Sequence, residues 1–223
     1  MKAKSYIYVL ILTFLLGACV SPPDNFPTVP EISFADISYV ELDNSIDSLL
    51  VSVKFRDAEG DLGLDARDIN PPFHPLEYQR DGQGNLITYA NRPSEAPSYN
   101  PIDWVIDPIV DNVEVMDTIW VKQNPNFSNI FIQFFIKRNG TFTEFKWSDP
   151  PYYTTFNGRF PVILEGDNQR AIEGTIKYSM RSSGWRSIFR NDTVRLDIQI
   201  QDRALNKSNT VSTPEFTLDQ ISK

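Results

Sequence analysis

The sequence is poor in the side chains that most often build metal and redox centres, with one cysteine and one histidine among 223 residues. So few thiols and imidazoles exclude a zinc cluster of Cys and His ligands and a framework of disulfides. The histidine, His74, stands between prolines, where we expect a surface or packing role. Neither a Gly-x-Ser-x-Gly motif nor a glycine-rich phosphate loop is present. These absences argue against nucleophilic and phosphoryl-transfer catalysis.

Positive charge is also scarce. The chain has 21 Lys and Arg residues against 29 Asp and Glu, which gives a formal net charge of −8 and a pI near 4.7. Nucleic-acid binding needs a basic face, so we expect no nucleic-acid partner. Hydrophobic residues make up 41% of the chain and charged residues 22%, which is typical of a folded protein and excludes wholesale disorder.

The one long hydrophobic run is N-terminal and short. Lys2 and Lys4 precede an apolar stretch from Tyr6 to Ala18, which is shorter than the roughly 20 residues of a membrane-spanning helix. Its length is typical of a signal peptide. The stretch ends in Leu16-Gly17-Ala18-Cys19, which resembles the lipobox of bacterial lipoproteins. The resemblance implies a signal peptide over residues 1–18 and an acylated Cys19 that anchors the chain in the bilayer of the outer membrane, on its periplasmic face or at the cell surface. The alternative is a plain secretory signal.

After the cysteine, residues 19–31 contain four prolines. A stretch of this composition forms neither a helix nor a central strand, because proline lacks the amide hydrogen that both require. We therefore expect a semi-rigid tether between the lipidated Cys19 and a folded part.

From residue 32 onward the hydrophobic pattern has a period of two. Apolar residues alternate with polar ones over Ser48–Phe55 and again over Val194–Gln201, as expected for half-buried strands. Further strands are predicted at Thr118–Lys122, Ile130–Lys137, Phe142–Lys146, Phe160–Leu164, Thr175–Met180 and Val211–Leu218. Asn139-Gly140 predicts a tight hairpin turn.

These strands predict an all-β fold, an immunoglobulin-like antiparallel β-sandwich that forms a single elaborated domain over residues 32–223. Residues 65–101 are rich in proline and predict a long insertion with its own small hairpin, of which Gln83–Asn91 is a part.

An acidic loop follows the first of these strands. Asp57, Glu59 and Asp61 alternate along it, and glycines at 60 and 63 permit a tight turn. If the strands before residues 57 and 202 are strands B and F of an immunoglobulin-like sandwich, their loops emerge at the same pole. Asp202 and Asn206 then join the three acids as oxygen ligands of a calcium ion. The alternative is that the acids form turns and that Arg203 neutralises them without metal.

Two segments resemble a known group of proteins. Phe55-Arg56-Asp57-Ala58-Glu59-Gly60-Asp61-Leu62-Gly63-Leu64 is similar to a signature of uncharacterised Bacteroidetes lipoproteins, and Asp202-Arg203-Ala204-Leu205-Asn206-Lys207-Ser208-Asn209 is similar to their C-terminal segment. The Asp-X-X-Gly-Asp turn also resembles cadherin-like and other immunoglobulin-like repeats. The resemblance implies a β-sandwich at the cell envelope and brings no activity with it.

Three tripeptides resemble the O-glycosylation acceptors of Bacteroidetes: Asp47-Ser48-Leu49, Asp117-Thr118-Ile119 and Asp192-Thr193-Val194. The resemblance implies glycosylation at one or two of these positions at most.

Aromatic side chains suggest where a ligand binds. Trp147, Tyr152 and Tyr153 lie on one loop that two prolines restrain, and exposed rings there would suit a sugar or a partner protein. The alternative is that the rings close the end of the sandwich. We therefore expect a non-catalytic, calcium-stabilised interaction module at the envelope, whose partner is an envelope protein or a glycan.

A glycan-binding or glycan-processing protein is the alternative function. Glycoside hydrolysis needs two carboxylates and aromatic platforms. Five acids lie near Trp104 and Trp120: Asp103, Asp107, Asp111, Glu114 and Asp117.

Overall fold

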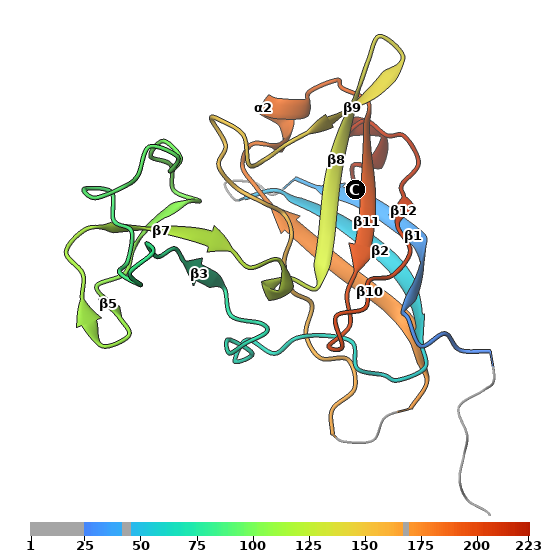
Figure 1. Cartoon of the computed structure of the whole chain (residues 1–223). Helices are drawn as coiled ribbons and strands as arrows, with labels where there is room; N and C mark the ends of the chain where they lie inside the picture. The colour runs from blue at the N-terminus through green and yellow to red at the C-terminus, as the bar shows by residue number, and fades with distance from the viewer. Residues whose placement is uncertain (1–24, 42–45, 167–169) are drawn as a thin grey trace, which may run out of the picture.

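Two antiparallel sheets pack face to face in the computed structural model, which describes residues 25–41, 46–166 and 170–223 (Figure 1). The first sheet has the order β1-β2-β10, with β1 at Glu31–Val40, β2 at Ser48–Asp57 and β10 at Ile172–Arg181. The second has the order β12-β11-β8-β9, with β12 at Val211–Ser212, β11 at Val194–Ile200, β8 at Ile130–Arg138 and β9 at Thr141–Phe145. The predicted all-β sandwich is confirmed, and its immunoglobulin-like subtype stays a prediction.

Alternation along the strands builds the core between the sheets. In β11 every second side chain from Val194 to Ile200 is buried, and β2 buries Leu49, Val51, Val53 and Phe55 in the same way. Each such side chain contributes about 1.5–3 kcal/mol when it leaves water completely. The hairpin between β8 and β9 turns at Asn139 and Gly140, both with positive φ, as predicted.

An arm, defined here as residues 65–123, leaves the sandwich between β2 and β8 (Figure 1). Its small sheet has the order β3-β7-β4, with β3 at Leu76–Tyr78, β7 at Thr118–Gln123 and β4 at Trp104–Ile106. A hairpin of β5 (Ile109–Val110) and β6 (Val113–Glu114) forms its far end. The insertion is longer than the predicted 65–101, because β7 pairs with β3 and β4 and so belongs to the arm.

A small hairpin is present within the insertion, as predicted. Arg80 and Leu86 form a bridge around a turn in which the Gly84 N–H donates to the Asp81 carbonyl at 3.0 Å. The predicted Gln83–Asn91 segment therefore supplies the end of the turn and the second side of this hairpin, and residues 80–82 supply the rest.

Two predicted strands need correction. Phe160–Leu164 is not a strand, because the Phe160 N–H donates to Asn129 Oδ1 at 2.9 Å instead of to a neighbouring strand. The Phe160 carbonyl accepts from Asn129 Nδ2 at 3.0 Å and from the Leu64 N–H at 3.1 Å. The strand predicted at Val211–Leu218 ends at Ser212. Pro214 follows closely and cannot donate to a ladder.

Short helical segments complete the structure: the α-helix α2 at Trp185–Phe189 and the 3-10 turns η1 at Pro125–Phe127 and η2 at Asp219–Ile221. Within the described ranges no helix is both long and apolar enough to cross a membrane. The predicted signal peptide, Cys19 and the first part of the tether lie outside those ranges. The end of the tether runs beside β2, where the Ala58 N–H donates to the Pro27 carbonyl at 2.9 Å.

Candidate functional site

The loop after β2 and the loop after β11 meet at one end of the sandwich. Leu62 and Asp202 form an antiparallel bridge, and the Arg203 N–H donates to the Asp61 carbonyl at 3.2 Å. Two segments more than 130 residues apart along the chain therefore form one structure, as the sequence predicts. We call Asp57, Glu59, Asp61, Asp202 and Asn206 the acidic pole.

Asp57 is the most deeply buried member of the acidic pole, with 0% of its surface exposed. Its Oδ2 accepts a hydrogen bond from the Gly60 N–H at 2.6 Å, which closes the turn. Its Oδ1 is buried and has no hydrogen-bond partner within the described part of the chain, and the same holds for Asp61 Oδ1. Burying a carboxylate oxygen without a hydrogen-bond donor costs free energy. Binding a proton or a cation at these two atoms would reduce that cost.

Burial and the neighbouring negative charges also raise the pKa values of two acids in the pole. The pKa of Asp57 is raised to about 6, mainly by burial and also by the charges of Asp61, Asp202 and Glu59, and the Gly60 hydrogen bond opposes the rise. Burial, Asp202 and Glu59 also raise the pKa of Asp61. Like charges thus face one another in a partly desolvated site. Such a site favours any ligand that brings positive charge.

Asn206 and Asp202 play a local role at the pole. Asp202 Oδ1 accepts from the Asn206 N–H at 2.7 Å, and its Oδ2 accepts from Asn206 Nδ2 at 2.9 Å. Leu205, between them, has a φ of 70° and so adopts the left-handed conformation that usually belongs to glycine. Asp202 is therefore a turn former as well as a negative charge at the pole.

Arg203 does not neutralise these acids through an ion pair. Its Nη1 lies 2.7 Å from Asp68 Oδ2, which belongs to the first part of the arm. Within the described residues no group of three or more His, Cys, Asp or Glu side chains is placed to hold a metal ion. The side chains of the pole thus stand close enough to interact electrostatically, but they do not form a finished coordination sphere.

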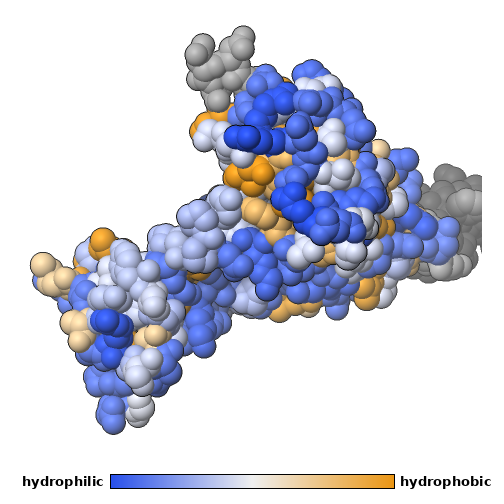
Figure 2. Space-filling model, turned by 90° about the horizontal axis from the view of Figure 1, so that it is seen from above, coloured by the Kyte–Doolittle hydropathy of each residue, from blue (hydrophilic) through white to orange (hydrophobic). Residues whose placement is uncertain are grey.

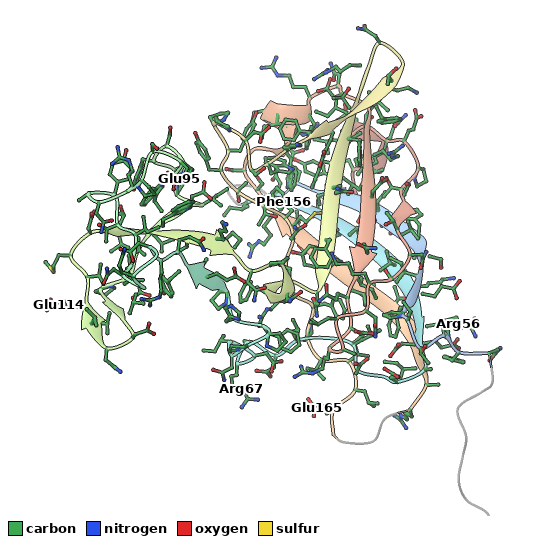
Figure 3. All side chains as sticks on the ribbon, viewed as in Figure 1. Arg56, Arg67, Glu95, Glu114, Phe156 and Glu165 are labelled. Carbon is green, nitrogen blue, oxygen red and sulfur yellow. The ribbon has the colours of Figure 1, made fainter. Side chains whose placement is uncertain are left out.

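The acidic pole adjoins the root of the arm. Arg159 donates to three carbonyl oxygens there, those of Asp65 at 3.0 Å, Asp68 at 2.9 Å and Phe73 at 2.8 Å. Figure 3 shows Arg67 where the arm begins. Sequence patterns do not predict this role of Arg159, because a lone arginine between Gly158 and Phe160 has no local pattern that points to distant carbonyl groups.

The aromatic loop is not the exposed platform that the sequence suggested. Trp147 is only 7% exposed, and its ring centroid lies 5.6 Å from that of Phe134 and 5.5 Å from that of Trp185. The exposed-ring prediction is therefore wrong for Trp147, which closes the end of the core. Tyr152 is 37% exposed and Tyr153 is half-buried, so the loop presents one ring with a substantial free face.

A groove of about 520 Å³ lies beside this loop. Phe131 and Gln133 of β8 contribute to its lining, with Asp197 and Gln199 of β11 and with Lys146 and Trp147 after β9. Carboxylate, amide and ammonium groups share it with aromatic rings, which makes it a mixed polar and apolar surface.

At least three of the five carboxylates near Trp104 and Trp120 form hydrogen bonds or ion pairs within the arm. Asp107 accepts a hydrogen bond from the Tyr78 hydroxyl, Asp111 pairs with Arg80, and Asp103 accepts from Asn100 Nδ2 at 2.6 Å. Trp104 is buried and stacks on Trp120 with 6.3 Å between ring centroids. Trp104 therefore offers no exposed ring beside these acids, Trp120 is half-buried, and the glycan-processing alternative stays a prediction.

Comparison with known proteins yields no match: no family model, curated protein or solved structure is similar to this chain.

Proposed function

We propose that the chain is a lipid-anchored, non-catalytic interaction module of the bacterial envelope, and that a calcium ion at the acidic pole stiffens the root of its arm. One observation carries the calcium part of the proposal: Asp57 Oδ1 and Asp61 Oδ1 are buried carboxylate oxygens without a hydrogen-bond donor in the described part of the chain, and like charges surround them. Calcium prefers oxygen ligands on flexible loops, so it suits these atoms.

The chain's own residues would supply the ligands. Asp57 and Asp61 each offer one unused oxygen, and Glu59 lies on the turn between them. Because three carboxylates do not yet converge, Glu59 or Asp202 has to turn toward the ion on binding. The bound charge would then remove the repulsion that raises the pKa values of Asp57 and Asp61.

Location supports a stiffening role. Residues 57–61 of the acidic pole lie between the end of β2 and the first residues of the arm, and the loop after β11 supplies Asp202 and Asn206. An ion there would hold the root of the arm against the sandwich.

The proposed membrane anchor rests on Lys2, Lys4 and the lipobox resemblance at Cys19. An acylated Cys19 would attach the chain to the outer membrane.

Thermal unfolding of the full chain tests the calcium proposal. A ligand at about 100 times its dissociation constant adds roughly 2.7 kcal/mol to the free energy of unfolding, which for this length raises Tm by about 5–10 °C. We expect this shift when millimolar calcium replaces EDTA. Asp61→Asn should abolish it, and Asp149→Asn, at an exposed acid elsewhere, should keep it. An equal Tm in calcium and in EDTA for the unmodified chain contradicts the proposal.

Glycan binding is the second candidate function, and the groove beside Trp147 favours it. Sugars combine polar hydroxyls with apolar ring faces, and this groove offers both amide side chains and aromatic rings. Titration calorimetry with neutral oligosaccharides tests it, and Gln133→Ala should weaken binding if the groove is the site. Binding that is unchanged in this variant would remove the groove from consideration.

A further inference from the structure

The far end of the arm exposes more apolar surface than a folded chain usually leaves uncovered over so few residues. Ile106 is 80% exposed, Ile109 64%, Val113 59% and Met116 89%, all within one stretch of eleven residues. Figure 2 shows hydrophobic side chains at this end of the molecule, set among hydrophilic ones. We call these four residues and the acids among them, Asp107, Asp111 and Glu114, the arm end. Clustered exposed apolar residues mark interaction sites.

The local structure keeps these side chains outward. The hairpin of β5 and β6 turns at Asp111 and Asn112, whose φ angles of 51° and 63° are those of a tight two-residue turn. Val110 and Val113 pair across the hairpin, and Val110 fills the interior of the arm while Val113 remains exposed. The arm thus has its own buried residues, and the four exposed apolar residues do not contribute to its core.

Charge at the arm end has one sign. Between residues 93 and 121 the chain has six acidic residues and no lysine or arginine: Glu95, Asp103, Asp107, Asp111, Glu114 and Asp117. Arg80 reaches in from the neighbouring turn and pairs with Asp111. Figure 3 shows Glu114 at the extremity. Three of the exposed apolar residues, Ile106, Val113 and Met116, are each followed directly by an acid.

We propose that the arm end docks onto a partner protein whose surface has an apolar centre and a rim of lysine and arginine side chains. The proposal rests on the interaction-module function and names the chemistry of its partner. Complementary charge speeds association and rejects surfaces of the same sign. A second copy of this arm end would place like charges against each other, and an anionic lipid surface would repel it. A protein surface with an apolar centre and a basic rim can bury the apolar residues and pair with the acids at the same time.

Two synthetic peptides of equal length test this chemistry, one of alternating leucine and lysine and one of alternating leucine and glutamate. Binding to the full chain is measured by fluorescence anisotropy at low and at physiological salt. We expect the leucine–lysine peptide to bind at least about tenfold more tightly than its acidic counterpart, with an affinity that falls as salt rises.

Matched variants locate the binding. The double variant Ile109→Ser/Met116→Ser and the single variant Glu114→Lys should each weaken it about tenfold or more. Ile69→Ser changes another exposed apolar residue, 56% exposed at the root of the arm, and should leave it unchanged. All four positions are exposed, so equal Tm values for the variants show that folding is retained.

Several results would overturn the proposal. Equal binding of both peptides would remove the charge argument, and unchanged binding in the arm-end variants would place the peptide elsewhere on this acidic chain. If the chain forms dimers and the double variant does not, the arm end binds a second copy of the chain instead of a basic partner. If a Cys19→Ser chain floats with phosphatidylcholine vesicles and the double variant no longer does so, the arm end binds a membrane instead of a protein. The calcium-induced Tm shift is measured separately, so failure of either proposal is recognised on its own.

Discussion

Arg203 pairs with Asp68 at 2.7 Å rather than with the acids of the pole beside it. This ion pair joins the loop after β11 to the root of the arm and holds the pKa of Asp68 below its usual value. Within the described residues Arg203 forms no ion pair with the acids of the pole, so neutralisation by this arginine is not observed, and calcium binding stays a prediction. Asp57 Oδ1 and Asp61 Oδ1 have no hydrogen-bond partner among the described residues.

Replacing Asp57 by asparagine should stabilise the protein at neutral pH in EDTA. The pKa of Asp57 is about 6 in the folded protein and about 3.9 in an unfolded chain. The unfolded state therefore loses its proton first, and this group lowers the free energy of unfolding as pH rises from about 4 to about 6. The total is roughly 2–3 kcal/mol, present at all higher pH.

The amide introduced by Asp57→Asn would still accept the Gly60 hydrogen bond without carrying the charge. Urea unfolding of both proteins between pH 4 and 8 measures the difference, which should be small at pH 4 and largest above pH 6. The same substitution should abolish the calcium response. A variant that is less stable than the parent at pH 7.5 in EDTA would contradict this account of Asp57.

Gly63 should tolerate no side chain. Its φ is 103°, and a Cβ atom there would lie 2.2 Å from the Pro161 carbonyl oxygen. Gly84 is the matched control, with a φ of 86° and open space around its Cβ position. We expect Gly84→Ala to cost about 1–2 kcal/mol from backbone strain alone and Gly63→Ala to cost clearly more. Chemical denaturation measures both, and equal losses would show that the approach to Pro161 is not tight.

Arg159 should hold the root of the arm in place. Arg159→Met removes its hydrogen bonds to the carbonyls of Asp65, Asp68 and Phe73 and leaves them to water. Hydrogen exchange should then accelerate around residues 65–75 while the amides of β11 remain protected, because the core of the sandwich is untouched. Arg67→Met changes an exposed arginine of the same segment and should have little effect. Unchanged exchange in Arg159→Met would mean that packing alone fixes the root.

Trp147 should behave as a core residue. Trp147→Ala is expected to cost about 3–5 kcal/mol, because it leaves a cavity among Phe134, Phe156 and Trp185. Tyr152→Ala, on the same loop but 37% exposed, should cost far less. Urea unfolding compares the two. Similar small losses would restore Trp147 as a candidate ligand platform.

Local patterns in the sequence determined several features without help from the fold. Alternation predicts β2 and β11, because strands bury every second side chain, and Asn139-Gly140 predicts the turn between β8 and β9, because both residues accept positive φ. The acids after β2 are visible for the same reason, since they are close together in the chain. The acidic stretch of the arm can also be counted from the sequence.

Contacts between distant segments decided the rest. The Asn129 side chain accepts the hydrogen bond of the Phe160 N–H and so removes a predicted strand, and α2 with β8 surrounds Trp147 and buries it. Arg203 pairs with Asp68, which is remote in sequence, and Asp57 Oδ1 is buried without a hydrogen-bond partner in the described part of the chain. Burial and partner choice are properties of the packed chain, because they depend on which groups the fold brings within a few ångströms, and no local pattern records that.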